Sequence, residues 1–169
     1  MSERPARPTR ADFVAWRTVT TRWRDDDAYG HLNNATYYEL FDTAVNAHLY
    51  EKTGVDVRAL PQIGVVAETS CRYFRELGFP APIETGMVVD KVGTSSIVYR
   101  IGLFQGPSEE AAAEGRFVHV YVDNTHGAGG TGCAHGVPSA LSDGGAQRRR
   151  PRRSWGALMP TPPARAAAR

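Results

Sequence analysis

Apolar side chains recur at three- and four-residue steps over about 20 residues near the start of the chain, a spacing typical of a helix with one buried face. Asn33 and Asn34 are suitable N-cap residues, because a short side-chain oxygen can accept from the first free backbone N–H groups. Gly54 supplies the stop. We therefore predict one helix from Asn34 to Gly54, roughly 30 Å long. Its expected buried positions are Tyr37, Phe41, Ala44, Val45, His48 and Leu49.

Other segments alternate with a period of two, which is typical of strands with one buried face. Such strands are predicted at residues 13–22, 63–73, 83–92, 96–104 and 114–122. In the second of them, the face that we expect to be buried carries Val65, Ala67, Thr69, Cys71 and Tyr73. A strand, a long helix and four strands in hairpin-like succession predict an α+β fold, in which an antiparallel sheet covers one helix.

The length and composition are those of a single domain, because 169 residues with 41% hydrophobic side chains suffice for one core. The net charge of +2 hides an asymmetry, since seven of the 20 basic residues lie at or after Arg148. Two cysteines are too few for a disulfide framework. No segment has the apolar length of a signal peptide or a membrane span. We therefore expect a cytoplasmic protein without a membrane partner.

Both ends of the chain differ in composition from its middle. Residues 1–12 are polar and predict a flexible leader, whereas residues 124–169 are dominated by Gly, Ala, Pro and Arg. The latter composition cannot bury enough apolar surface to become ordered. We expect residues 13–123 to form the domain and residues 124–169 to form a disordered, basic tail. A native tail and an out-of-frame tail both remain open.

Three patterns in this tail do not predict a site. Residues 127–132 spell a dinucleotide-binding glycine motif, but no helix can open from it. The basic run at residues 148–153 lacks interleaved aromatic residues and a recognition fold, so nucleic acid is not expected as a partner. The spacing of His126, Cys133 and His135 is not that of a structural zinc site, so no metal is expected either.

The acidic loop and the start of the predicted helix read D-D-D-A-Y-G-H-L-N-N-A-T-Y-Y from Asp25. Further on, the chain reads C-R-Y-F-R-E-L-G-F-P from Cys71 and V-G-T-S-S-I-V-Y from Val92. Together these stretches resemble the hotdog-fold acyl-CoA thioesterases of the 4-hydroxybenzoyl-CoA thioesterase family, over residues 14–123. The resemblance implies a sheet wrapped around a central helix, homodimers or homotetramers built by edge-to-edge pairing, an acyl-CoA substrate, and no metal or redox cofactor.

The same resemblance implies the catalytic residues. Asp27 occupies the position of the family's catalytic carboxylate, which could be a nucleophile or a general base. The backbone N–H of Asn34 would face the thioester oxygen, and Gly30 would allow a tight turn. His31 could shape the loop or transfer a proton with Glu39 or Asp42 as its acidic partner. Judged by spacing alone, the three acids could instead be a solvated loop that complements the helix dipole.

Candidates for substrate binding have structural alternatives. Asn33 could contact the substrate or only cap the helix, and Tyr37 could line an acyl pocket or belong to the core. Ser95 and Ser96 lie at a hairpin that, in the resembling family, runs near the nucleotide arm of coenzyme A. Arg72 could bind a phosphate. A hotdog protein that binds acyl-CoA without turnover, and a thioesterase acting on acyl carrier protein through Arg72 and Arg75, are the alternative functions.

Overall fold

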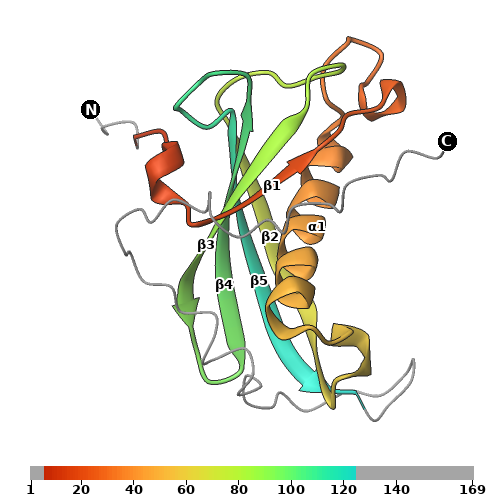
Figure 1. Ribbon diagram of the computed structural model, residues 1–169, viewed down its shortest axis with the longest axis vertical. Coiled ribbons are helices and arrows are strands. Elements are labelled where there is room, and N and C mark those ends of the chain that lie inside the picture. Colours follow the sequence, from red (N-terminus) through yellow and green to blue (C-terminus); the bar gives the residue numbers. More distant parts are fainter. Residues whose placement is uncertain (1–5, 125–169) are drawn as a thin grey trace, which may run out of the picture.

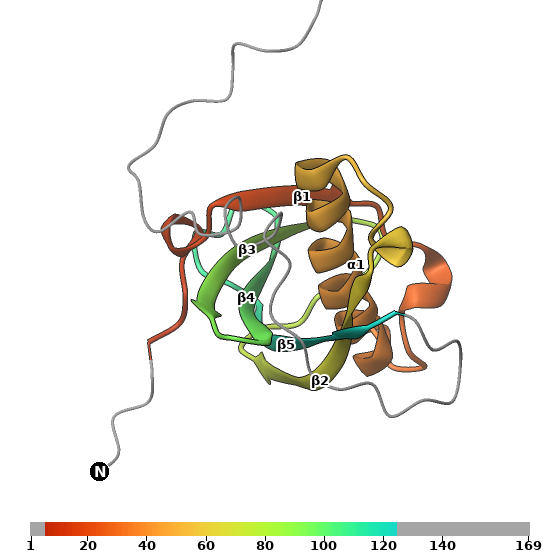
Figure 2. The ribbon, with the colours of Figure 1, turned by 90° about the horizontal axis from the view of Figure 1, so that it is seen from below.

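The computed structural model describes residues 6–124, which form one long helix and a five-stranded antiparallel sheet (Figure 1). The main elements are β1 (Ala15–Val19), α1 (Asn34–Thr53), β2 (Gln62–Tyr73), β3 (Ile83–Val92), β4 (Ser96–Gln105) and β5 (Ala113–Asp123). Three short 3-10 turns are η1 (Arg10–Asp12), η2 (Trp23–Asp25) and η3 (Val57–Ala59). The sheet curves around one side of α1 (Figure 2), which confirms the predicted hotdog fold.

The helix begins and ends where its sequence predicts. The side-chain oxygen of Asn33 accepts from the Ala35 N–H at 2.9 Å, and Gly54 closes the last turn with a φ of 65°. Its buried face comprises Tyr37, Leu40, Phe41, Ala44, Val45 and Leu49. His48 is only half-buried, while Leu40 joins the buried face.

The strand order is β1-β3-β4-β5-β2, so β2 pairs with β5 rather than with its successor β3. The predicted hairpin-like succession is therefore wrong at its first step, although β3, β4 and β5 do follow one another as antiparallel neighbours. Alternation along a strand specifies which side chains share a face but not which strand lies beside it. The segment between β2 and β3 carries the chain from one edge of the sheet to the far side of β4.

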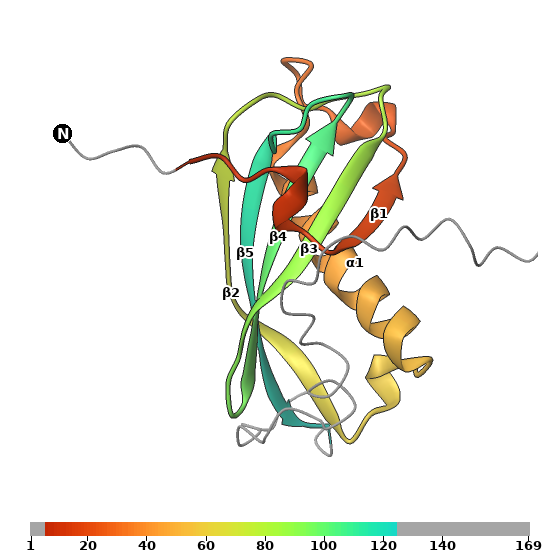
Figure 3. The same ribbon diagram turned by 60° about the vertical axis from the view of Figure 1, so that its left-hand side comes forward.

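Strand β2 lies at an edge of the sheet (Figure 3), and its predicted buried face is exposed over most of its length. Of that face, Val65, Ala67, Thr69 and Tyr73 are exposed. Val66, which was not predicted on it, is 47% exposed, and a β-bulge shifts the register between Val66 and Glu68. The prediction of a buried face fails here because β2 pairs with β5 on one side only and has no strand beside its outer edge. Only Cys71 and the first residues of β2 are half-buried.

The main core fills the space between α1 and the concave face of the sheet. The ring of Phe41 lies so close to β5 that a Cβ on Gly115 would come within 2.6 Å of it. A glycine at this position therefore permits the helix to approach the sheet. The largest fully buried side chains on β3, β4 and β5 that share this core are Ile83, Tyr99, Ile101, Leu103 and Tyr121.

A second, smaller cluster of Phe13, Phe104 and Ala111 lies apart from the main core. Residues before β1 are fastened beside it, since the Arg10 N–H donates to the Glu109 carbonyl at 2.9 Å. These contacts belong to the fold, although the sequence analysis assigned residues 6–12 to a leader. The predicted tail lies outside the described residues from 125 onward. No helix within residues 6–124 has the length and apolar character required to cross a membrane.

His119 on β5 is a titratable group inside the main core. Its side chain is 2% exposed, and its Nδ1 has no hydrogen-bond partner among the described residues. The rings of Phe117, Tyr99 and Tyr121 surround it at centroid distances of 5.1, 5.8 and 6.2 Å. Burial lowers the pKa of His119, against a smaller opposing effect of Asp42. The folded protein therefore holds this imidazole neutral.

We predict that the free energy of unfolding decreases as the pH falls from 7 to 5. The unfolded chain binds a proton at His119 more readily than the folded chain, so acid favours unfolding by up to about 1.4 kcal/mol per pH unit. The half-buried His48, whose pKa burial also lowers, adds to this slope. His119→Phe keeps a ring in place and should make the decrease in Tm between pH 7 and pH 5 shallower. An equally steep decrease in the variant would contradict a neutral buried His119.

Candidate active site

The loop between β1 and α1, residues 25–33, is called the acid loop here, and its first aspartate has a structural role. Asp25 is 7% exposed and accepts from the Arg22 N–H at 2.7 Å. Its carboxylate also pairs with the Arg22 guanidinium at 2.9 Å. Burial disfavours the ionised form, but the hydrogen bonds from Arg22 outweigh this effect and hold the pKa of Asp25 below its ordinary value. Asp25 is thus occupied in fixing the start of the loop.

The second aspartate connects the acid loop to residues 74–82, the segment that follows β2. The Asp26 carboxylate accepts from the Phe79 N–H at 3.1 Å. Beside it, the Leu32 N–H donates to the Leu77 carbonyl at 2.8 Å. These two bonds hold the acid loop against the end of β2.

The third aspartate, Asp27, lies within a tight turn that leaves part of its carboxylate available. Its Oδ1 accepts from the N–H groups of Tyr29 at 2.8 Å and His31 at 3.2 Å. Gly30 has a φ of 80°, in the left-handed region that favours glycine, and donates to the Asp27 carbonyl at 3.2 Å. No donor among the described residues reaches Oδ2. The half-buried carboxylate is thus oriented through Oδ1, which leaves Oδ2 available as an acceptor.

The N-terminus of α1 presents a free donor next to this loop. The Asn33 N–H donates to the Asp25 carbonyl at 2.8 Å, and the Ala35 and Thr36 N–H groups both donate to Asn33. The Asn34 N–H has no acceptor among the described residues, as is usual for the first position of a helix. Such an N–H, at the positive end of a 20-residue helix, is suited to stabilising a negative oxygen.

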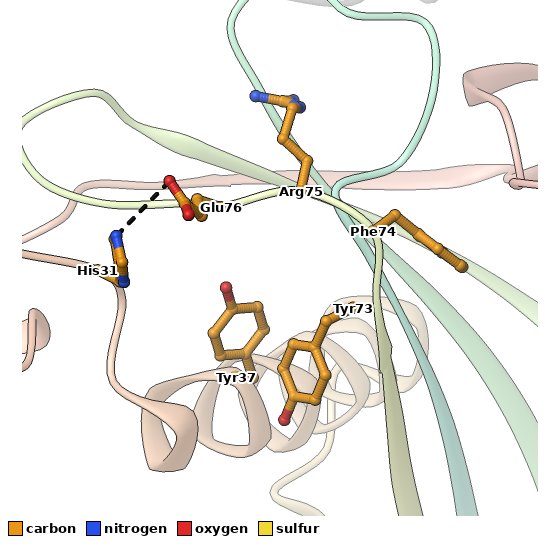
Figure 4. Close-up of a pocket in the computed structure, with 6 residues that line it drawn as sticks. All are labelled: His31, Tyr37, Tyr73, Phe74, Arg75 and Glu76. Carbon is orange, nitrogen blue, oxygen red and sulfur yellow. Dashed lines mark ion pairs between the residues drawn. The ribbon is translucent and has the colours of Figure 1, made fainter.

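A pocket of about 660 Å³ opens between the start of α1 and the end of β2 (Figure 4). It is lined by His31, Tyr37, Tyr73, Phe74, Arg75 and Glu76. Two residues of the predicted site, His31 and Tyr37, lie in this lining. Asp27 lies beside it, since its carboxylate accepts from the His31 N–H.

Two tyrosines form one wall of the pocket. The rings of Tyr37 and Tyr73 meet edge to face at 5.0 Å between centroids, and the Tyr73 hydroxyl donates to the side-chain oxygen of Asn34. Burial raises the pKa of Tyr37 to about 12, with smaller contributions from Cys71, Glu76 and Asp27. Burial likewise raises the pKa of Tyr73. Both hydroxyls therefore stay protonated at neutral pH, and the charge of Asp27 acts on a residue of the pocket.

His31 pairs with a carboxylate that the sequence analysis did not consider. Its Nε2 lies 3.6 Å from Oε2 of Glu76. Of the two predicted partners, Glu39 pairs with Arg22 at 3.7 Å and Asp42 accepts from Asn46 on the next turn of the helix. The structure therefore does not pair His31 with Glu39 or Asp42, which contact Arg22 and Asn46 instead.

Arg72 does not line the pocket. It pairs with Glu114 on the neighbouring β5 at 3.1 Å, and its guanidinium lies over the Phe74 ring at 5.1 Å. Arg100 approaches the same Glu114 at 3.9 Å and pairs with Asp90 at 3.2 Å. These charges form a row across four strands of the sheet, so Arg72 is engaged in structure rather than oriented toward a ligand.

Ser95 and Ser96 lie at the opposite end of the sheet from the acid loop in this chain. They lie between the paired residues Val92 and Ile97, in the hairpin that joins β3 to β4 at the bottom of Figure 1. The other end of β4, at Gln105, bonds to Gly78 at 2.7 Å beside the acid loop. The structure therefore does not bring the two serines together with Asp27.

Sequence reasoning missed Tyr73, Phe74 and Glu76 as pocket residues. They belong to the stretch C-R-Y-F-R-E-L-G-F-P, which supports the family resemblance. Their place in this stretch could have indicated that they lie near the site. Their position next to His31 depends on the hydrogen bonds between the acid loop and residues 74–82, which no spacing rule predicts. Among residues 6–124, no three His, Cys, Asp or Glu side chains are arranged to hold a metal ion.

Solved structures similar to this chain support the fold, and one of them is also similar in sequence. The crystal structure of the PA5185 protein from Pseudomonas aeruginosa is 42% identical with a TM-score of 0.76, covering 83% of this chain and 95% of that chain. A gentisyl-coenzyme A thioesterase, BH1999, is 17% identical with a TM-score of 0.65, covering 76% of this chain and 99% of its own. A Thermus thermophilus thioesterase, solved with coenzyme A and Zn, is 22% identical with a TM-score of 0.65, covering 79% and 92%. The last two share the fold with this chain.

A search of curated proteins gave no match. A family model described as the thioesterase-like superfamily matches residues 21–168. These residues include the acid loop, the helix, β2 to β5 and nearly all of the segment predicted as a tail. With this match over most of its length, and a 42% identical relative of the same fold, the chain belongs to the thioesterase-like superfamily.

Proposed function

We propose that this protein hydrolyses an acyl-CoA thioester to a free carboxylic acid and coenzyme A, with the acid loop and the N-terminus of α1 as its active site. The observation that carries the proposal is the arrangement of Asp27. One carboxylate oxygen is fixed by two backbone N–H groups, and the other is unbonded among the described residues. Asn34, whose N–H is free among the described residues, is the first residue of the adjoining helix. The pocket opens beside Asn34 and Asp27.

Asp27 can act by either of two routes. As a nucleophile, its free oxygen attacks the thioester carbonyl carbon, the C–S bond breaks with its electron pair going to sulfur, and water then opens the resulting mixed anhydride. As a general base, the carboxylate takes a proton from water as that water attacks the carbonyl. Both routes need an ionised carboxylate with one accessible oxygen.

The negative charge that develops on the thioester oxygen needs a donor, and the Asn34 N–H fits this role. A single preorganised donor of this kind contributes about 10²- to 10³-fold to the rate in other acyl-transfer enzymes. The helix dipole adds partial positive charge at the same point. Asn33 contributes by capping the helix, which keeps its first turn in place.

The pocket beside Asp27 is suited to the acyl group, because Tyr37 and Tyr73 give it aromatic walls with protonated hydroxyls. A coenzyme A thioester is supported by the relatives, since one is a gentisyl-coenzyme A thioesterase and another was solved with coenzyme A. An acyl carrier protein would need a free basic surface. Arg72 is paired with Glu114, and Arg75 donates to the Gln105 carbonyl at 3.1 Å, which favours the coenzyme A substrate.

We also propose that the active enzyme is a homodimer formed through β2. Its edge carries exposed apolar side chains, including Val65 and Val66, and unpaired backbone groups of this kind favour pairing with another strand. Tyr73, at the end of this strand, is 50% exposed and also lines the pocket. A second copy paired along β2 would therefore lie beside the acyl group and shield it from water.

We predict that Asp27→Asn abolishes hydrolysis while the fold is retained. The asparagine oxygen can still accept from the Tyr29 and His31 N–H groups, so the turn should persist, but the amide is neither a nucleophile nor a base. Thiol release from short, medium, long and aromatic acyl-CoAs should fall by about 10²- to 10⁴-fold. Asp42→Asn, which changes an exposed acid on α1, should keep wild-type activity and a similar Tm.

The same assay separates this function from the binding-only alternative. Thiol release by the wild-type protein that is lost in Asp27→Asn supports hydrolysis at the acid loop. Saturable acyl-CoA binding without thiol release by the wild-type protein would contradict it and favour a binding protein.

We predict that replacing Val65 and Val66 together by lysine converts the protein from a dimer to a monomer. Both side chains are at least 41% exposed, so the charges should not disturb the core, but they would repel across a β2–β2 pair. Light scattering after size-exclusion chromatography measures the mass. Tyr50→Lys, at an exposed position on α1, is the matched control and should stay dimeric. A wild-type protein that is active as a monomer would refute the proposal.

A further inference from the structure

Tyr73 connects the end of β2 with the first residue of α1, although the two residues are 39 positions apart in the chain. Its hydroxyl donates to the side-chain oxygen of Asn34. The Tyr73 ring meets the Tyr37 ring edge to face at 5.0 Å between centroids. In Figure 4 the two hydroxyls point in opposite directions, and that of Tyr37 is directed toward the side of His31 and Glu76. The Tyr37 hydroxyl thus faces the pocket, whereas the Tyr73 hydroxyl contacts the start of the helix.

The backbone that carries Tyr73 is fixed on the sheet. Tyr73 pairs with Ala113 of β5, at the last position of β2. Directly after it, the N–H groups of Phe74 and Arg75 both donate to the Ala112 carbonyl, at 2.8 and 3.0 Å. The sheet therefore determines where the Tyr73 hydroxyl lies relative to the helix.

The contact occupies an acceptor that would otherwise compete for the free N–H of Asn34. An asparagine side-chain oxygen can accept from the backbone N–H of its own residue or of a near neighbour. The preceding residue makes such a bond, since the Asn33 side-chain oxygen accepts from the Ala35 N–H at 2.9 Å. The side-chain oxygen of Asn34 instead accepts from Tyr73. The Asn34 N–H is thereby left without an acceptor among the described residues.

We propose that Tyr73 is a positioning residue, whose hydroxyl holds the Asn34 side chain away from the Asn34 N–H and so keeps this N–H available to the thioester oxygen. This inference rests on the proposed thioester hydrolysis. As the attacking oxygen bonds to the carbonyl carbon, an electron pair moves to the carbonyl oxygen, which needs a donor. A donor that already serves a protein acceptor stabilises this charge less, because the existing hydrogen bond must first be broken. Tyr73 therefore acts through Asn34.

Both partners of the Tyr73–Asn34 hydrogen bond keep their form around neutral pH. Burial raises the pKa of Tyr73, and the nearby Cys71 and Tyr38 side chains add to this effect. The phenol therefore keeps the proton that it donates, and the amide of Asn34 does not titrate. We expect the contribution of Tyr73 to be the same between about pH 6 and pH 8.

Tyr73→Phe removes the hydroxyl and keeps the ring against Tyr37. We expect kcat for an acyl-CoA to fall about two- to tenfold with KM unchanged, because the net free energy of one hydrogen bond corresponds to a factor of this size. Tyr50→Phe removes the hydroxyl of an exposed tyrosine on α1, outside the pocket, and should keep the wild-type kcat. Tm is measured for each variant.

Two inhibitors separate stabilisation of the oxyanion from a structural role. A trifluoromethyl ketone analogue of the acyl-CoA forms a tetrahedral adduct with a negative oxygen, so its affinity should fall in Tyr73→Phe by the same factor as kcat. A thioether analogue that lacks the carbonyl oxygen should bind equally to Tyr73→Phe and wild type. A tyrosine that only shaped the pocket would affect both analogues.

A double variant tests whether Tyr73 acts through Asn34. Asn34→Ala removes the side-chain oxygen that Tyr73 restrains and keeps the backbone N–H. Adding Tyr73→Phe to Asn34→Ala should therefore cause no further loss of kcat.

The outcomes are distinguishable. A wild-type protein that releases no thiol from any acyl-CoA removes the proposed function, and this inference with it. With an active wild type, three results overturn the inference alone: an unchanged kcat in Tyr73→Phe, an equal loss of affinity for both analogues, or the same loss of kcat from Tyr73→Phe in the Asn34→Ala background. Equal Tm values for the variants and the wild type exclude unfolding as the cause.

Discussion

The proposed active site depends on the hydrogen bonds between the acid loop and the segment after β2. Asp26 accepts from the Phe79 N–H, and the Leu32 N–H donates to the Leu77 carbonyl. These bonds bring the start of the helix to the end of an edge strand, and the pocket occupies the space between them. Without them, His31 and Tyr37 would lie on one side of an open gap, with Tyr73 and Glu76 on the other.

The three consecutive aspartates of this loop have different roles, because the carboxylate of each one has different hydrogen-bond partners. Asp25 is buried and neutralised by Arg22, so it acts as a structural anchor. Asp26 uses its carboxylate to hold a neighbouring backbone. Asp27 alone keeps one oxygen without a donor among the described residues. The two structural contacts of Asp25 and Asp26 therefore leave Asp27 as the acid of this run that could serve the proposed reaction.

The sequence predicted the elements of the fold better than their arrangement. The helix limits follow from Asn33 and Gly54, because capping is a local interaction. The position of β2 next to β5 could not be predicted, since it depends on contacts between residues far apart in the chain. Among the site residues, Gly30 was identified correctly as the turn residue. Glu76 was missed because its proximity to His31 is created only when two loops join.

The exposed edge of β2 gives a physical reason to connect assembly with activity. An edge strand with apolar side chains and unpaired backbone groups is unfavourable in water unless another strand covers it. In this chain that strand ends at Tyr73, which is half-exposed, lines the pocket and donates to Asn34 at the start of the helix. Covering the edge would bury Tyr73 further and lower the local dielectric around Asn34 and Asp27. Electrostatic stabilisation of a negative oxygen is stronger in such an environment. Pairing of a second strand with β2 would therefore also favour stabilisation of a negative oxygen near Asn34.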